Sequence, residues 1–476
     1  MNFKRIRFVE VEDLHEIHEK SLNLLSGTGV QFHSEEALEL LKKCGAKVDG
    51  IVVRFPGSMV NDALSQCPQS YLFEARNRNQ AVRIGEGIVI ATNAGCIYVQ
   101  DIDRGRRRGT LKDYTDIQKL YQASPICNIV GYTPVDTADI ASEVKHLYMM
   151  FETLRHTDKP VLCWTLKRKK IRQLIKMVEI AFGEIHDSAG TYITGVGINP
   201  LSPLVYSHDA VDTIIECSLH NQPIFLSPSP MTGITSPIQL PGTVVLQNAE
   251  ILAGIVLIQL LNPRNPVVYM PGAFIGSMKY ANCIMGSPEI MLMNSVNVQL
   301  ALELYHLPTR SHAGTTDAKS CDVQAGLETM QNMMMSLFSG VHMFHLALGV
   351  LDSAYCTCLE KMIVDEEIFE RMLRLDKGFE ISGASFSTDI IKEVGIKGFY
   401  LAHESTLSNC RNFWQPLVSN WEPYSLWKSD GSKSVLERAN AIVKDRLNKA
   451  PEKMIDETVE KELLKYIRFA EKDEQN

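Results

Sequence analysis

The chain has few of the features that mark secreted or membrane-spanning proteins. None of its eleven cysteines forms a CxxC pair, and the nearest two, Cys356 and Cys358, are badly spaced for shared metal ligation, which favours reduced thiols. No stretch offers the roughly 18 uncharged apolar residues of a membrane span. The most apolar run, starting at Ile251, ends at Asn262 and Pro263 and predicts a buried helix. The charged N-terminus lacks the apolar core of a signal peptide. We therefore expect a cytoplasmic protein with no membrane partner.

An excess of basic residues is also absent. The chain has 56 acidic and 48 basic side chains, a formal charge of −8, whereas a face that neutralises phosphates usually makes a domain basic. The two basic runs, RGRRRG at 104–109 and KRKK at 167–170, are interpreted as solvated loops or helix starts. Nucleic acid is therefore not expected as a partner.

What the chain does contain is a regular alternation of strand and helix patterns. Eight short apolar segments read as strands, beginning at Gly87, Ile126, Pro160, Tyr192, Pro223, Pro266, Leu307 and His342. Helical patterns follow them, beginning near Leu111, Ala138, Arg168, Ser207, Gly242, Ser287, Asp322 and Leu359. Steps of roughly 30 to 45 residues, with one helix after each strand, are typical of a (β/α)8 TIM barrel.

The barrel divides the 476 residues into three parts. Residues 1–85 read as a helical N-terminal extension, residues 86–378 as the barrel, and residues 379–476 as loops and helices that pack on the barrel or on a second subunit. In such barrels the residues just past each strand lie on the C-terminal face, where the active site is found.

The stretch 311–340 holds the densest polar chemistry on that face. His312 and Asp317 precede a helical pattern that opens with Asp322 and Gln324. His312, Asp317 and Gln324 are the catalytic candidates, although Asp322 and Gln324 could simply cap backbone amides. His312, Asp317, Asp322 and His345 are metal-ligand types but lack the HxH or HxxxH spacing of a metal site, so no metal is expected.

Six segments resemble one known family. PMTGITSPIQLPGTVVLQNAEILAGIVLIQLLNP from Pro230 and HAGTTDAKSCDVQAGLE from His312 closely resemble the trimethylamine methyltransferase (MttB-like) family. IHEKSLNLLSGTGVQF, CGAKVDGIVVRFP, CPQSYLFEARN and RGRRRGTLKDYTD are similar to it as well. The likeness extends to about residue 425 and implies a TIM barrel, in agreement with the strand count.

The resemblance also implies a reaction. Founding members of the family carry pyrrolysine and demethylate trimethylamine, whereas this chain contains standard residues throughout and resembles the branch that acts on quaternary amines such as glycine betaine, proline betaine or carnitine. It implies methyl transfer to cob(I)amide carried by a separate corrinoid protein, with no cofactor bound tightly in this chain, and a homo-oligomer.

Such a transfer needs no catalytic acid or base, because the amine leaves as a neutral group. The protein must orient one methyl group, exclude water and surround a cation, a task suited to aromatic faces. The substrate-binding candidates near predicted strand ends are Asn93, Tyr98, Trp164, Tyr269, His312, Phe344, His345 and Tyr355.

Two alternatives remain open. One is a cofactor-free barrel lyase or isomerase in which His312 works with Asp317 or Asp322 as acid and base. The other is a catalytically silent subunit that docks a corrinoid protein.

Overall fold

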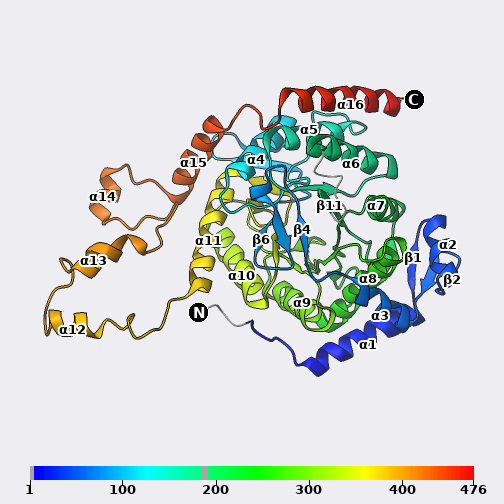
Figure 1. Cartoon of the computed structure of the whole chain (residues 1–476), viewed down its shortest axis with the longest axis horizontal. Coiled ribbons are helices and arrows are strands. Elements are labelled where there is room, and N and C mark those ends of the chain that lie inside the picture. The colour runs from blue at the N-terminus through cyan, green and yellow to red at the C-terminus, as the bar shows by residue number, and fades with distance from the viewer. Residues whose placement is uncertain (1–4, 184–190, 476) are drawn as a thin grey trace.

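Eight short parallel strands form the centre of the structure and lie inside a layer of helices (Figure 1). The computed structural model describes residues 5–183 and 191–475. The central strands are β6 (Val89–Ile90), β9 (Val130–Gly131), β10 (Val161–Trp164), β11 (Thr194–Ile198), β13 (Ile224–Leu226), β15 (Val267–Tyr269), β18 (Arg310–His312) and β19 (Met343–His345). Each of the eight predicted strand segments contains one of them.

Parallel pairings connect these strands into a ring. One sheet has the order β15-β13-β11-β10-β9 and a second has the order β18-β19-β6. The parallel bridges Ala91↔Ile129 and Tyr269↔Thr309 join the two sheets at both ends. Because every neighbour is parallel, all eight strands end on the same side of the ring.

The helices that return the chain between strands begin close to the predicted starts, except that the helix expected near Ala138 begins at Lys145. They are α4 (Leu111–Ala123), α5 (Lys145–His156), α6 (Arg168–Phe182), α7 (His208–Leu219), α8 (Leu240–Leu261), α9 (Pro288–Gln299), α10 (Val323–Ser339) and α11 (Leu359–Lys377). A π-helical turn, Leu300–Tyr305, extends α9. Capping side chains start several of them: Thr110 caps α4, Ser207 caps α7 and Asp322 caps α10.

Helix α8 is the most apolar helix of the ring. By length and composition it could cross a membrane, but 83% of its most apolar window is buried inside the protein. Helices α1 (Val11–Gly27) and α3 (Gly57–Gln66) cover its outer side. The buried helix predicted around Ile251 is confirmed.

The N-terminal part is less helical than the sequence suggested. Besides α1, α3 and α2 (Glu35–Lys43) it contains the antiparallel strands β1 (Val30–Phe32), β3 (Val52–Arg54) and β2 (Lys47–Asp49). Strand β12 (Val205–Tyr206), from the loop after β11, joins β1 in parallel. Strands β4 (Tyr71–Phe73) and β5 (Val82–Ile84) form a hairpin. Its residues Tyr71, Phe73 and Ile84 pack in the cluster that fills the ring. This hairpin closes the amino-terminal end of the barrel.

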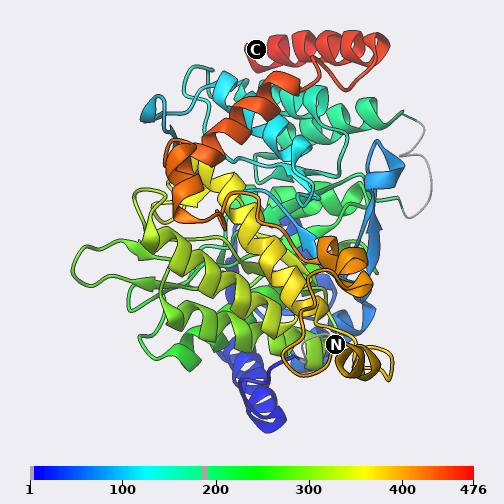
Figure 2. The ribbon, with the colours of Figure 1, turned by 90° about the vertical axis from the view of Figure 1, so that its left-hand side faces the viewer.

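The C-terminal part first leaves the barrel and then returns to it. Helices α12 (Thr388–Val394), α13 (Glu404–Asn409) and α14 (Tyr424–Ser429) stand away from the ring, beside α10 and α11 (Figures 1 and 2). Helix α15 (Val435–Lys449) then packs on α11 and α4, and α16 (Glu457–Gln475) packs on α6 and α5. An ion pair of Arg446 with Glu366, at 2.7 Å, ties α15 to α11.

Candidate active site

Two small sheets border the carboxyl-terminal end of the ring. One has the order β20 (Val350–Leu351), β21 (Cys356–Cys358), β7 (Tyr98–Asp101) and β8 (Gly105–Arg108). The other consists of β14 (Met231–Thr232), β16 (Phe274–Gly276) and β17 (Cys283–Ile284). All of these strands lie in segments that connect a central strand to the next helix, so both sheets stand around the mouth where barrel chemistry is found.

Alternation along the central strands decides which side chains enter the ring. Leu162 belongs to the inner cluster, whereas Val161 and Cys163 pack outward against the helices. On β19, Met343 packs inward and Phe344 outward. The register pairs Arg310 with Met343 and His312 with His345, so Arg310, His312 and His345 point into the ring.

Aromatic and imidazole rings pack together near the strand ends. His312 stacks on Phe274, with ring centroids 5.0 Å apart and planes inclined by 15°. His345 meets Tyr132 edge to face, with centroids 5.5 Å apart. Trp164, at the end of β10, packs partly buried against the same inner cluster as Tyr132. We call Tyr132, Trp164, Phe274, His312 and His345 the ring layer.

Tyr132 adopts an unusual backbone conformation. It follows β9 with φ of 58°, a left-handed angle that bulky residues rarely adopt and that is found more often at functional sites. Its hydroxyl lies where a side chain at position 197 would begin: a Cβ added to Gly197 would stand 2.1 Å from it. The glycine in β11 therefore makes room for Tyr132.

The two histidines of the ring layer are buried and neutral. Burial lowers the pKa of His312 well below the usual imidazole value, and the nearby Arg310 and His345 lower it further. Burial and Arg310 act in the same way on the pKa of His345. Nδ1 of each histidine is buried and has no hydrogen-bond partner. A general base functions best with a pKa near the working pH, so this environment disfavours acid–base catalysis by either ring.

Arg310 brings a positive charge into this space. Its side chain is 3% exposed, and burial lowers its pKa to about 9. The guanidinium donates to the carbonyl oxygen of Pro271 at 3.1 Å and to the hydroxyl of Ser227 at 3.2 Å, residues that lie just past β15 and β13. The charged group therefore lies at the level of the strand ends.

Four of the predicted substrate-binding residues lie at the mouth: Asn93, Trp164, His312 and His345. Asn93 is fully buried, donates to the carbonyl oxygen of Leu348, and has a side-chain oxygen without a partner. Trp164 also lines a cavity of about 290 Å³ between the loops after β6, β9 and β10, beside the 2.6 Å ion pair of Lys145 with Asp136.

The other four predicted residues lie elsewhere. Tyr269 points outward and donates to the side-chain oxygens of Asn248 and Asn297, both at 2.9 Å, and Phe344 packs outward on Phe369. Tyr98 belongs to the sheet beside the mouth, and Arg106 covers its ring at 4.4 Å. Tyr355 lies in the turn between β20 and β21 of that sheet and is 49% exposed. None of these four joins the ring layer.

The catalytic candidates Asp317 and Gln324 form hydrogen bonds within the loops and the helix start around the mouth. Asp317 accepts hydrogen bonds from the backbone amides of Met285 and Gly286 and from the hydroxyl of Ser353. It therefore joins the loops that follow β15, β18 and β19. Gln324 is exposed in the first turn of α10, where its amide donates to Glu328 at 2.9 Å.

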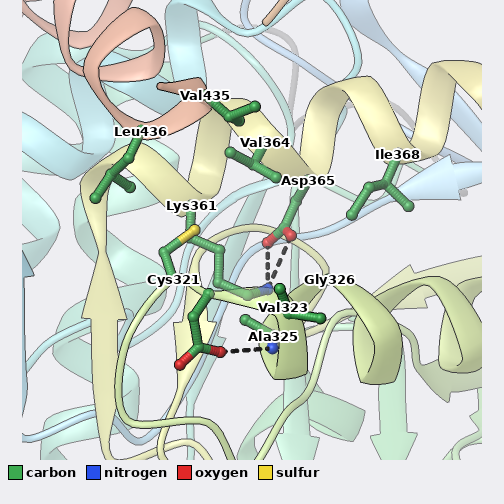
Figure 3. Close-up of a pocket in the computed structure, with 11 residues that line it drawn as sticks. Cys321, Val323, Ala325, Gly326, Lys361, Val364, Asp365, Ile368, Val435 and Leu436 are labelled. Carbon is green, nitrogen blue, oxygen red and sulfur yellow. Dashed lines mark hydrogen bonds and ion pairs between the residues drawn. The ribbon is translucent and has the colours of Figure 1, made fainter. Parts of the chain in front are cut away.

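A buried ion pair supports the loops behind the two histidines. In Figure 3, Lys361 and Asp365 of α11 face each other at 2.8 Å in a cavity of about 280 Å³ between α10, α11 and α15. Lys361 also donates to the carbonyl oxygen of Gly314, and Asp365 accepts from the amide of Gly349. Because these glycines follow β18 and β19, the pair fixes both loops from outside the ring.

Sequence reasoning missed Arg310 and Phe274, and it placed Tyr132 at a strand end without making it a site candidate. Arg310 could have been found from alternation, since it lies two positions before His312 on a predicted strand and must share its face. Tyr132 directly follows a predicted strand. No sequence signal shows that Phe274 folds back over His312.

The fold and the mouth define a class: an α/β-barrel protein with an aromatic, imidazole-lined opening at the carboxyl ends of its strands. Among residues 5–183 and 191–475, no three His, Cys, Asp or Glu side chains gather in a way that could hold a metal ion.

The chain belongs to the trimethylamine methyltransferase (MTTB) family, whose model matches residues 1–474. It is 31% identical to the glycine betaine methyltransferase of Desulfitobacterium hafniense over 421 residues, 88% of each chain. It is 30% identical to the proline betaine:corrinoid methyltransferase of Eubacterium limosum over 460 residues, 93% of each chain. Its fold resembles the monomethylamine methyltransferase of Methanosarcina barkeri, with a TM-score of 0.55, 12% identity, and coverage of 93% of this chain and 88% of that one.

Proposed function

We propose that this protein removes a methyl group from a quaternary amine and passes it to the reduced cobalt of a corrinoid carried by a separate protein. The observation that carries the proposal is the ring layer, in which rings at the ends of four central strands and one ring from β16 gather at the mouth. Ring faces attract a tetraalkylammonium without forming the strong ion pair that would overstabilise the bound substrate. The relatives named for glycine betaine and proline betaine at 31% and 30% identity support the same chemistry.

The proposed methyl transfer requires no proton transfer by the protein. Transfer breaks one C–N bond, leaves its electron pair on nitrogen, and moves the methyl group to the cobalt of the acceptor. Since the leaving amine is neutral, the lowered pKa values of His312 and His345 suit a role in binding and water exclusion. They give little support to a lyase or isomerase that uses His312 as base.

The decisive experiment is a methyl-transfer assay. Purified protein is mixed with cob(I)alamin, or with a corrinoid protein held as Co(I), and a panel of quaternary amines. We expect the Co(I) absorption to fall while a tertiary amine accumulates. Amine consumption without any cobalt acceptor would support the lyase alternative instead, and a tight complex with the corrinoid protein but no transfer would support a silent docking subunit.

We also propose that the reaction takes place in the cytoplasm. In addition, we propose that two copies of the chain associate through residues 379–430. Helices α12, α13 and α14 have no buried residue, although helices this short are marginal alone in water. Ile396 and Phe399 are 98% and 81% exposed. Glu367 of α11 nevertheless holds the segment by accepting from the amides of Val418 and Ser419. A twofold dimer would cover both segments in one interface.

Light scattering tests the association. The wild type should elute as a dimer, and the double variant Ile396→Ser, Phe399→Ser should shift towards the monomer with unchanged helix content. A monomeric wild type would contradict the dimer, and the exposed segment would then be tested against the corrinoid acceptor.

A further inference from the structure

Arg310 is a buried cation that lacks a carboxylate partner within the described residues. No carboxylate acts on its pKa, and the nearby Tyr132 is the one group that offsets the effect of burial on that pKa in the part of the chain that the structure describes. Two buried lysines are fully engaged: Lys361 pairs with Asp365 at 2.8 Å, and Lys159 donates to three backbone carbonyls at 2.7–2.9 Å. Burying an unpaired charge is costly, so an unpaired guanidinium in the ring is an unusual feature.

The guanidinium retains unused hydrogen-bond donors. Of its five N–H groups, one donates to Pro271 and one to Ser227. Nε is buried and has no partner. A planar group with free donors fits a carboxylate, which accepts two parallel hydrogen bonds.

The position of the Arg310 guanidinium would place such a carboxylate beside the ring layer. The backbone of Arg310 lies two residues before His312 on β18, but its guanidinium reaches the level of the strand ends, where it contacts Pro271 and Ser227. A ligand whose carboxylate meets Arg310 would have its other end among Phe274, His312, Tyr132 and Trp164 of the ring layer.

We propose that Arg310 binds the carboxylate of the substrate and so selects zwitterionic quaternary amines over simple quaternary cations. This inference rests on the proposed function. The carboxylate is held by Arg310, the trimethylammonium group lies in the ring layer, and one methyl group faces the acceptor. A cation without a carboxylate meets the guanidinium with no compensating charge and is repelled.

Calorimetric binding tests the assignment without any turnover. The probes are glycine betaine; 3,3-dimethylbutyrate, which keeps the carboxylate but has carbon in place of nitrogen; 3,3-dimethylbutan-1-ol, which lacks both charges; and choline, which lacks the carboxylate. We expect the wild type to bind 3,3-dimethylbutyrate more tightly than the alcohol, a comparison that needs no variant. Equal affinity for the two would overturn the assignment.

Variants add the test of the residue. In Arg310→Met we expect the affinity for glycine betaine to fall on the order of 10- to 100-fold, as for loss of charged hydrogen bonds, and the affinity for choline to stay the same or rise. Arg310→Lys, which keeps the charge but not the planar fork, should lie between the wild type and Arg310→Met. Parallel losses for choline and glycine betaine would mean that the variant damages the whole site and would contradict a carboxylate anchor.

Arg76→Met is the matched control. Arg76 is also largely buried, but it lies outside the ring and donates to the carbonyls of Leu154, Thr157 and Met454. Its loss should lower the melting temperature and leave the affinity for glycine betaine unchanged.

The two proposals can fail separately. Methyl transfer from glycine betaine with an unchanged KM in Arg310→Met would sustain the proposed function and remove Arg310 from the substrate site. Arg310-dependent binding of 3,3-dimethylbutyrate, with no transfer from any quaternary amine, would sustain the anion site and overturn the proposed function.

Discussion

Phe274 and His312 stack face to face, with ring centroids 5.0 Å apart, although they come from different strands and 38 positions separate them in the sequence. Phe274 belongs to a small sheet beside the mouth, and His312 ends a central strand. The contact therefore connects the border of the mouth to the floor of the site. It also turns one face of a neutral imidazole away from substrate, which makes His312 a packed part of the pocket wall.

Replacing Phe274 with alanine should weaken substrate binding. A lost aromatic face costs about 0.5–2 kcal/mol for a bound cation, which predicts a rise in Kd of roughly 2- to 30-fold. Titration calorimetry with glycine betaine measures the change. The control is Phe344→Leu, which alters a ring on the outward face of β19 and should lower the melting temperature without changing Kd. A larger Kd effect from Phe344→Leu than from Phe274→Ala would contradict the assignment of faces.

Replacing Gly197 with alanine should displace Tyr132. The added Cβ would lie 2.1 Å from the Tyr132 hydroxyl, and overpacking of this kind costs about 1–3 kcal/mol. Chemical denaturation should show this loss, together with weaker binding of the quaternary amine. In the double variant Gly197→Ala, Tyr132→Phe the missing hydroxyl should restore part of the stability, and strict additivity of the two changes would argue against the contact.

The rate of methyl transfer should be nearly independent of pH. No proton moves in the proposed step, and burial holds the pKa of both His312 and His345 well below the usual value, so both rings stay neutral across the neutral range. Single-turnover measurements between about pH 6 and 8 should give a constant rate at saturating amine. A steep limb that disappears in His312→Gln would show that the imidazole transfers a proton.

Stability should decrease as the pH falls below about 6.5. Because burial lowers the native pKa of His345, the unfolded chain binds a proton at a higher pH than the native chain does. The free energy of unfolding is therefore constant above the unfolded pKa and declines below it, by up to about 1.4 kcal/mol per pH unit. Urea denaturation at several pH values should show a shallower decline in His345→Gln than in the wild type. The same decline in the variant would contradict this, and His15→Gln, on the exposed face of α1, is the control.

The barrel could be predicted because its signals are long and repeated. Eight apolar segments alternate with long helices, and caps such as Ser207 and Thr110 mark helix starts. The strands of the N-terminal part could not be predicted in the same way. At three residues each, β1, β2 and β3 are too short to show a period, and they depend on partners distant in sequence, such as β12.

The site could be predicted less well than the barrel, because side chains along each central strand point alternately inward and outward. Central strands of a parallel barrel are buried on both faces, so their sequences do not reveal which side chains point inward. A shift of one position separates Tyr269 from Met270 and Phe344 from His345. Once His312 is placed inside, Arg310 follows from the period of two. The fold of β16 over the mouth depends on tertiary contacts that no local pattern encodes.

The hairpin of β4 and β5 has a consequence for the order of events. Tyr71, Phe73 and Ile84 pack into the amino-terminal end of the ring. Within the described residues, ligands must therefore enter and leave at the carboxyl-terminal end. The amine and the corrinoid protein must then reach the site through the same opening. The proposed reaction is therefore sequential. The amine binds first, and the acceptor protein then binds over it. The demethylated product is released only after the methylated acceptor protein has dissociated. Excess acceptor should trap the empty enzyme and inhibit competitively against the amine.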